Sequence, residues 1–265
     1  GSVTITIALD VQPDSRTNFR FSGGLGTFVL DDMMPDDGDA YHSAKTFVVP
    51  AGVYTVTERP VAGYLDAGIS CSPPADTIAD LANHQVIIDA GNGSNITCTF
   101  VIQRAGQIIA GKYNDHAHNH VRNSNDEWLS GWHMQMHNPF NPDVAEQVTR
   151  ADGRTVYTNL YPGSYTVCEV LQKRWFNITP AALDATYHQP CYTFTVVPGQ
   201  AVWVRFGNST TAAAVTGAAA GEQPVIDIVV CDLPATDDEG NEMSAERDPW
   251  EEEEESSSNT VFLPL

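Results

Sequence analysis

The sequence predicts an all-β protein made of two tandem β-sandwich domains and a C-terminal extension that ends in a β-strand. Short segments rich in β-branched and aromatic residues recur along the chain, and Gly, Pro and Asp separate them. A spacing of about 8–12 residues between such segments is typical of β-sandwiches. Only "ADTIADLANH" has the composition of a helical turn.

The strand-like segments form two successive groups. The first group is "VTITIAL", "NFRFSG", "GTFVLDD", "KTFVVPAG", "VYTVTERP", "QVIIDAG" and "NITCTFVI". The second is "GQIIAGKYND", "GWHMQMHN", "RTVYTNLYPG", "SYTVCEVL", "CYTFTVVPG" and "AVWVRFGN". Each group has enough strands for one sandwich.

An internal repeat supports this division. Residues 48–64, "VVPAGVYTVTERPVAGY", align with residues 159–175, "NLYPGSYTVCEVLQKRW", and both contain "YTV-x-E" after a turn. A cysteine-containing strand is expected to close each unit, "ITCTF" in the first and "CYTFTVVPG" in the second. The repeat predicts domains at 1–103 and 104–209, each of about 100 residues.

The remaining residues differ in composition. A small-residue linker is expected at 210–224 and an acidic extension at 225–265. The extension holds two apolar segments, "VIDIVVCDL" and "TVFLPL", and two strands cannot build a core of their own. The segment "TVFLPL" follows "EEEEESSS", which spans up to about 28 Å when extended. This arrangement suits donation of the strand to a sheet of a neighbouring copy; packing within its own chain and use as an anchoring tail stay open. The predicted subunit-contact residues are Thr260, Val261, Phe262, Leu263, Pro264 and Leu265.

The net charge of −21 is concentrated near the C-terminus. From Gly221 onward there are fourteen Asp and Glu against one basic residue, Arg247, so −13 of the charge lies there. A basic surface for nucleic acid is therefore not expected. The sequence also contains no run of about 18 apolar residues, so no membrane span is expected.

The cysteine pattern suggests an oxidising compartment. Cys71 and Cys98, and Cys168 and Cys191, fall in strand-like segments, one pair in each half of the chain. They are interpreted as two disulfides, with buried free thiols as the alternative. Cys231 is left over and is either free or paired with another chain.

The second half resembles the serine-aspartate-repeat B and Cna B-like domains of bacterial surface proteins, which are Ig-like or prealbumin-type sandwiches. The residues that carry this are "GKYNDHAHNHVRNSNDEWLSGW", "ADGRTVYTNLYPGSYTVCEV" and "VRFGN". The first half resembles SpaA-like pilin domains through "PAGVYTVTERPVAGY" and "ITCTF". The resemblance implies stalks, spacers and subunits of adhesins and pili. The "VFLPL" ending also resembles the termini of secreted proteins of Chloroflexota.

The resemblance implies a calcium loop and an internal cross-link in the second domain. "NDHAHNHVRNSND" offers Asp115, Asn119, Asn123 and Asp126 as calcium ligands, although Ala117 replaces one ligand of the family pattern. The cross-link is an isopeptide bond between Lys112 and Asn208, promoted by Glu169. The first domain keeps Glu58 but has Leu9 and Ile102 where Lys and Asn would stand, so it should not form the bond.

Other polar motifs give further candidates. His116, His118 and His120 alternate, so an extended backbone would place them on one face, where they could hold a transition metal; a solvated loop is the alternative. Sequons mark glycosylation candidates at Asn92, Asn95, Asn177 and Asn208. Nucleotide-binding and hydrolase signatures are missing, so no enzyme is expected.

These features predict a secreted or cell-surface structural subunit of an extracellular, pilus-like filament. Its partners are copies of itself, joined by the C-terminal strand, and no cofactor is required unless calcium binds. The alternative is an adhesin or stalk module that binds protein or carbohydrate. In that case Trp128, Trp132, Trp175 and Trp203 would form a sugar platform rather than pack in the core.

Overall fold

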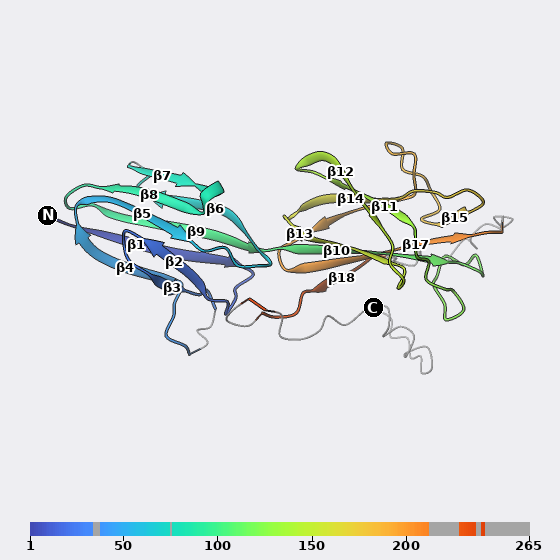
Figure 1. The fold of residues 1–265 in the computed structure, drawn as a ribbon, viewed down its shortest axis with the longest axis horizontal. Helices are drawn as coiled ribbons and strands as arrows, with labels where there is room; N and C mark the ends of the chain where they lie inside the picture. Colours follow the sequence, from blue (N-terminus) through green and yellow to red (C-terminus); the bar gives the residue numbers. More distant parts are fainter. Residues whose placement is uncertain (34–37, 75, 212–227, 237–239, 242–265) are drawn as a thin grey trace, which may run out of the picture. The chain divides into compact units, whose positions relative to one another are not determined.

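The protein is described by a computed structural model over residues 1–33, 38–74, 76–211, 228–236 and 240–241. Within these residues the regular elements are strands β1 to β18 and one 3-10 turn, η1 (Leu81–Asn83), drawn in Figure 1. The predicted all-β fold is confirmed, and η1 lies inside "ADTIADLANH". No helix in the described part of the chain is long and apolar enough to cross a membrane.

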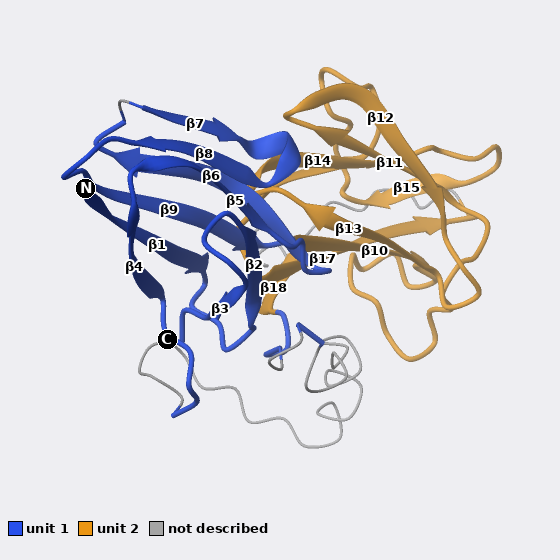
Figure 2. Cartoon of the chain, turned by 60° about the vertical axis from the view of Figure 1, so that its left-hand side comes forward, with its two compact units in different colours: residues 1–105, 233–245 blue, residues 106–232, 246–265 orange. Residues whose placement is uncertain are grey.

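The chain divides into two compact units, coloured separately in Figure 2. Unit 1 contains residues 1–105, and unit 2 begins at Gly106. This boundary lies two residues after the one that the sequence predicts. Of the described residues in the C-terminal extension, those of 228–232 belong to unit 2, and those of 233–236 and 240–241 belong to unit 1.

Unit 1 is a sandwich of a four-stranded and a five-stranded sheet. The first has the order β4-β1-β9-β6 and the second β3-β2-β5-β8-β7. The bounds are β1 (Ser2–Gln12), β2 (Phe19–Gly23), β3 (Phe28–Leu30), β4 (Ala44–Pro50), β5 (Gly52–Glu58), β6 (Tyr64–Ser72), β7 (Thr77–Asp80), β8 (Gln85–Ala90) and β9 (Asn95–Arg104).

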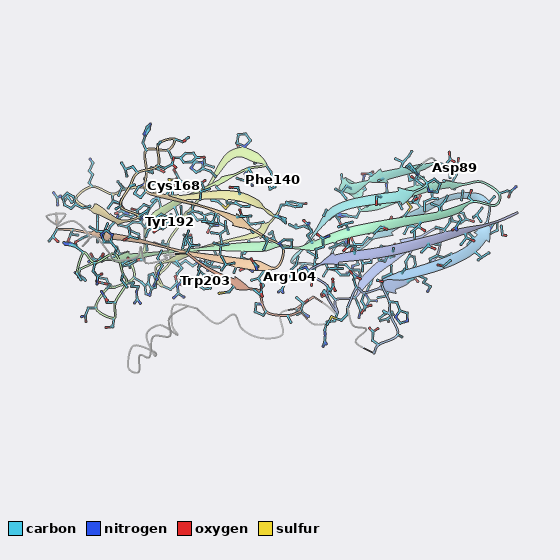
Figure 3. All side chains as sticks on the ribbon, turned by 180° about the vertical axis from the view of Figure 1, so that it is seen from behind. Asp89, Arg104, Phe140, Cys168, Tyr192 and Trp203 are labelled. Atoms are coloured by element: carbon cyan, nitrogen blue, oxygen red, sulfur yellow. A yellow bond between two sulfur atoms is a disulfide. The ribbon has the colours of Figure 1, made fainter. Side chains whose placement is uncertain are left out.

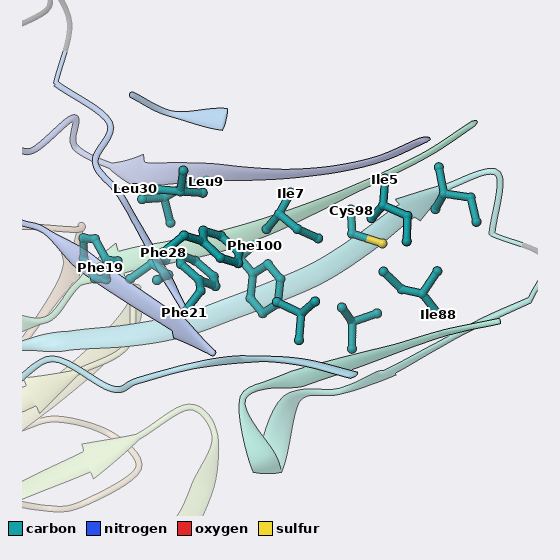
Figure 4. Packing of buried hydrophobic residues seen from close by; sticks show 14 of the residues in the cluster. Ile5, Ile7, Leu9, Phe19, Phe21, Phe28, Leu30, Ile88, Cys98 and Phe100 are labelled. Carbon is teal, nitrogen blue, oxygen red and sulfur yellow. The ribbon is translucent and has the colours of Figure 1, made fainter. Parts of the chain in front are cut away.

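The core of unit 1 lies between the two sheets. Alternate residues of β1 point inward, and those at positions 3, 5, 7, 9 and 11 are all buried. Aromatic rings from the other strands meet them, as Figure 4 shows for Phe19, Phe21, Phe28 and Phe100. Phe21 stacks on Phe28 at 5.1 Å and meets Phe100 edge-on at 5.2 Å. The contact between Phe21 and Phe100 joins the two sheets, because β2 and β9 belong to different sheets, and it buries apolar surface between them.

Unit 2 has the same two-sheet construction. One sheet has the order β13-β10-β17-β15, with β18 also paired to β17, and the other has the order β12-β11-β14-β16. The bounds are β10 (Gly106–Asn114), β11 (His133–Asn138), β12 (Asn141–Val148), β13 (Arg154–Leu160), β14 (Gly163–Glu169), β15 (Phe176–Thr179), β16 (Cys191–Val196), β17 (Gln200–Ser209) and β18 (Ile228–Asp232).

The two units have the same parallel pairing of their first strand. In unit 1 the first strand β1 pairs in parallel with β9, and in unit 2 β10 pairs in parallel with β17. β9 therefore corresponds to β17, and the expectation that "ITCTF" and "CYTFTVVPG" are equivalent closing strands is wrong. The second segment forms β16, which pairs with β14 in the other sheet. Both strands contain a cysteine and alternate in hydrophobicity, so only the pairing distinguishes them.

β18 gives the first apolar segment of the extension a place in its own chain. It pairs antiparallel with the first half of β17, from Gln200↔Asp232 to Val204↔Ile228, whereas β15 pairs with the end of β17. Ile228 also packs against the core of unit 2. This segment therefore completes a sheet within the described chain.

The residues after β18 are held by unit 1. The hydroxyl of Thr236 lies 2.7 Å from that of Tyr64 and 2.9 Å from that of Thr17, all buried. Arg104 donates a hydrogen bond from Nη1 to the carbonyl of Leu233 at 3.2 Å. The predicted subunit-contact strand at 260–265 and most of the linker at 210–224 lie outside the described residues.

Both expected disulfides are present, one in each unit. Cys71 on β6 bonds to Cys98 on β9, and Cys168 on β14 bonds to Cys191 on β16. Figure 3 labels Cys168 within unit 2. The two bonds are not equivalent, because they join different strand pairs in the two units. Cys231 lies on β18 opposite Ala201 and belongs to neither disulfide.

Candidate functional site

The residues expected to form a cross-link converge inside unit 2. Lys112 lies on β10, Asn208 lies near the end of the adjacent parallel strand β17, and Glu169 ends β14 in the facing sheet. Glu169 follows Tyr165 and Val167 on the inward face of β14, as the period of a strand requires. All three side chains are fully buried.

The contacts within this cluster are close. Lys112 Nζ lies 2.5 Å from Glu169 Oε2, and the side chains of both residues are 0% exposed. The ammonium also lies over the ring of Trp132, 4.5 Å from its centroid. Neither side-chain atom of Asn208 that can hydrogen bond has a clear partner, so its carboxamide is buried and under-satisfied.

Burial shifts both ionisable groups toward their neutral forms. Desolvation lowers the pKa of Lys112 to about 8, although the neighbouring Glu169 opposes this shift. Desolvation also raises the pKa of Glu169, and the neighbouring side chains of Lys112 and Asn208 oppose this shift. A neutral amine is a nucleophile, and a protonated carboxyl group can donate a proton, so the cluster contains the groups needed for amide exchange.

Unit 1 has the same framework without the reactive pair. In unit 2, Lys112 on β10 is paired with Phe206 on β17, and Asn208 lies two residues after Phe206. In unit 1, Leu9 on β1 is paired with Phe100 on β9, and Ile102 lies two residues after Phe100. Leu9 and Ile102 therefore occupy the positions of the lysine and the asparagine, as the sequence predicts. Glu58 ends β5 at the position equivalent to Glu169 and is 1% exposed.

Glu58 lies beside Asp66 and His84, two neighbours that the sequence did not predict. A carboxylate oxygen of Glu58 lies close to a carboxylate oxygen of Asp66 and an imidazole nitrogen of His84. These three atoms all lie within 4.8 Å of one another. Burial raises the pKa of Glu58 to about 8, and the charge of Asp66 adds to this effect. Asp66 and His84 follow Glu58 by 8 and 26 residues, a spacing that matches no common metal-ligand motif. The only signal in the sequence is an acidic residue on the inward face of a predicted strand.

The expected calcium residues lie in the loop between β10 and β11. Both carboxylate oxygens of Asp115 and of Asp126 accept hydrogen bonds from backbone amides of the loop. Asp115 accepts them from Asn119 (3.2 Å) and His120 (2.9 Å). Asp126 accepts them from His116 (2.9 Å) and Asn123 (2.8 Å). Both aspartates are buried. Their oxygens thus cap the loop internally, and calcium binding at this loop stays a prediction.

The three alternating histidines do not lie on an extended backbone. His118 and His120 have φ of +53° and +65°, so the chain turns at both residues. His116 contacts Glu127, His118 contacts Ser209, and His120 contacts Thr179. The single face of imidazoles that an extended backbone would give is therefore not formed, because the rings contact three different parts of unit 2: the loop itself, β17 and β15. A metal held by all three together would require the loop to change its conformation.

The glycosylation candidates differ in accessibility. Asn92 and Asn95 are exposed beside the turn between β8 and β9, and Asn177 on β15 is half-buried. Asn208 is fully buried, so the folded chain cannot present this sequon at the surface.

The tryptophans pack rather than form a sugar platform. Trp132 and Trp203 are buried, and Trp175 meets Trp132 edge-on at 5.3 Å. The guanidinium of Arg122 lies 4.3 Å from the ring centroid of Trp128, and that of Arg154 lies 5.2 Å from it. The four tryptophans named for the carbohydrate-binding alternative therefore do not form an exposed row of rings.

Comparisons with known proteins agree with the fold of unit 1. A family model described as a prealbumin-like fold domain, SpaA_4, matches residues 5–104. No curated protein matches. Unit 1 is therefore a SpaA-like domain of the prealbumin type, as the sequence motifs predict. The chain places it in tandem with a second sandwich of the same register, unit 2.

Three solved structures illustrate the wider similarity. The Bacillus anthracis TIE protein is 14% identical, with a TM-score of 0.33, over 78% of this chain and 34% of that chain. GBS52, the minor pilin of Streptococcus agalactiae, is 12% identical, with a TM-score of 0.32, over 82% and 99%. The shaft pilin SpaA from Lactobacillus rhamnosus GG is 8% identical, with a TM-score of 0.31, over 80% and 99%.

Proposed function

We propose that this protein is a structural subunit of an extracellular, pilus-like fibre and that its second unit is stiffened by an isopeptide bond between Lys112 and Asn208. The observation that carries the proposal is the buried contact of Lys112 with Glu169 at 2.5 Å, beside the buried carboxamide of Asn208. A SpaA-like domain in the same chain supports it, and so does one disulfide in each unit, since disulfides persist outside the cytosol.

The proposed reaction needs no external reagent. The neutral amine of Lys112 attacks Cγ of Asn208, and a new C–N bond forms. The bond from Cγ to Nδ2 breaks, and Nδ2 leaves as ammonia. Glu169 donates a proton to the amide oxygen as charge develops there and relays the proton of the amine to the leaving nitrogen, so the carboxyl group is unchanged at the end.

Such a bond suits a protein that bears tension. Lys112 lies on the first strand of unit 2 and Asn208 on β17, the strand that pairs with it in parallel. Force that enters at β10 and leaves after β17 would pass through the bond instead of through the residues between them. A cross-link that closes a loop of about 100 residues also stabilises by about 4.7 kcal/mol on the chain-entropy model.

Intact-mass spectrometry tests the cross-link. The wild-type chain is expected to weigh one ammonia less than its sequence with two disulfides, and Asn208→Ala should show the full mass. Glu169→Gln should fold but retain the ammonia, because its amide cannot relay protons. A wild-type chain of full mass would rule out the bond.

Assembly by the C-terminal strand is the second part of the proposal. Residues 260–265 are apolar on both faces and follow an acidic tether, which suits insertion into the sheet of another copy. Electron microscopy of the full chain is expected to show filaments that are lost when 260–265 are deleted. Filaments that persist after the deletion would argue against strand donation. A deletion that lowers only the melting temperature would instead favour packing within one chain, as β18 does.

A further inference from the structure

We propose that Glu58, Asp66 and His84 form a binding site in unit 1 for a divalent transition metal of the zinc type. The three residues come from separate elements: Glu58 ends β5, Asp66 lies on β6, and His84 stands between η1 and β8. One ligand atom from each lies within 4.8 Å of the other two. Within the described residues, no other set of three or more His, Cys, Asp and Glu side chains meets this distance.

The backbone aims each side chain at the same point. Glu58 shares the inward face of β5 with Val56. Asp66 shares a face with buried Tyr64, and a register shift against β9 follows it between Asp66 and Gly68. Bulges of this kind redirect side chains and are common near binding sites. The carbonyl of His84 accepts a hydrogen bond from the amide of Glu58 at 2.8 Å, which fixes these two residues to each other.

A carboxylate in this position needs a partner. Glu58 is 1% exposed, and its Oε1 has no hydrogen-bond partner. Asp66 already contacts the imidazole Nδ1 of His84, so two carboxyl groups and one imidazole face a single small volume. A buried carboxylate is costly unless it is paired or binds a metal. A cation here would bind the free oxygen of Glu58 and make its charged form favourable beside Asp66.

The donor set selects the metal. One imidazole nitrogen with two carboxylate oxygens suits Zn²⁺ and its neighbours, whereas Ca²⁺ and Mg²⁺ prefer oxygen ligands alone. Zn²⁺ binds such ligands at about 2.0–2.2 Å and is usually four-coordinate, so these three side chains and one water molecule would fill its coordination sphere. The side chain of His84 is 37% exposed, which gives the ion access and leaves a coordination position for water.

The metal would tie the two sheets of unit 1 together. β5 belongs to one sheet and β6 to the other, so Glu58 and Asp66 bring ligands from both layers, and His84 adds a third from the residue just before β8. Glu58 stands at the position of Glu169, but Leu9 and Ile102 cannot cross-link. Metal coordination would thus connect the sheets of unit 1, whereas the proposed isopeptide bond would cross-link unit 2 covalently. The metal inference rests on unit 1 alone and holds whether or not unit 2 is cross-linked.

Zinc titration of the full chain tests the site, after chelator treatment and dialysis. Calorimetric titration should show binding that Asp66→Asn and His84→Asn weaken at least tenfold. Asn suits position 84 because it tolerates the observed φ of +54°. Zinc at about 100 times its dissociation constant should raise the melting temperature of unit 1 by roughly 10 °C in the wild type only. Co²⁺ in place of Zn²⁺ should give visible absorption bands that the same variants lose.

The control removes the other histidine cluster. His116→Asn, His118→Asn and His120→Asn together should leave zinc affinity and the Co²⁺ spectrum unchanged. Zinc binding that is lost in this triple variant and kept in His84→Asn would overturn the proposal. Absence of zinc binding by the wild-type chain would overturn it as well. Neither result would alter the mass of the chain, so the test is separate from that of the isopeptide bond.

Discussion

Two glutamates at equivalent positions show how neighbouring residues decide the chemistry of one side chain. Glu58 and Glu169 both follow "YTV" and one further residue, and both are buried at the end of an inward-facing strand. Glu169 faces Lys112, so a proton can be shared between an amine and an acid. Glu58 faces Asp66 and His84, so the same residue type becomes a metal-ligand candidate.

The buried amine of Lys112 should make the stability of unit 2 depend on pH. Its folded pKa is about 8, below the ordinary lysine pKa of 10.5. Between these values the unfolded chain binds the proton and the folded chain does not, so the free energy of unfolding rises with pH. This gain in the free energy of unfolding should be lost as the pH falls back to the folded pKa of Lys112. In the uncross-linked Glu169→Gln, Asn208→Ala chain no carboxylate opposes desolvation, so the pKa of Lys112 should lie lower still. Urea unfolding of this chain should therefore show a free energy of unfolding that rises with pH up to the ordinary pKa of lysine.

The matched control for this pH dependence also carries Lys112→Met. Both chains lack the carboxyl of Glu169 and the cross-link, so the difference between their pH profiles belongs to Lys112. An identical rise in both chains would mean that Lys112 keeps an ordinary pKa.

At the scale of elements, β18 is a strand that its sequence alone could not place. Ile228 packs against the core of unit 2, whereas Val230 is 50% exposed on the same strand. Ile228→Ala should lower the free energy of unfolding of unit 2 by about 1–2 kcal/mol, because only part of a buried side chain is lost. Val230→Ala should change it by less than about 0.5 kcal/mol. Denaturant unfolding followed by tryptophan fluorescence measures both, and equal effects would contradict the packing of Ile228 against the core of unit 2.

The loop between β10 and β11 shows the limit of a motif at this scale. The sequence correctly marks 114–126 as a polar loop rich in ligand-type residues. It does not show that Asp115 and Asp126 use their oxygens to cap loop amides, or that His118 and His120 turn the chain. Backbone conformation decides which of these donors remain available.

At the scale of the molecule, each unit carries its own disulfide, and the tryptophans report on one unit. All five tryptophans lie after residue 105, so none belongs to the first 105 residues. Replacing Cys71 and Cys98 by Ser should lower the free energy of unfolding of unit 1 by about 3–4 kcal/mol for a loop of this length. Circular dichroism should then show an earlier transition, while the tryptophan transition of unit 2 stays in place.

The reciprocal variant completes this test. Replacing Cys168 and Cys191 by Ser should shift the tryptophan transition, and Cys231→Ser, outside both disulfides, should leave it nearly unchanged. If either pair of substitutions moved both transitions together, the two units would unfold as one cooperative body.

The sequence by itself determined the features that depend on local pattern. Alternation of apolar residues gives the strands, the repeated "YTV-x-E" gives two units, and the cysteines give the two disulfides. It also named Lys112, Glu169 and Asn208, because a family motif fixes their order along the chain.

Only the tertiary structure decided which strands pair and which side chains meet. It assigned β9 and β17 as equivalent strands, gave β18 a partner, and brought Asp66 and His84 to Glu58. Strand pairing joins residues that are far apart in the chain, and their alternation is the same whichever partner they take. For this reason the sequence predicts that a face is buried, while the fold decides what it is buried against.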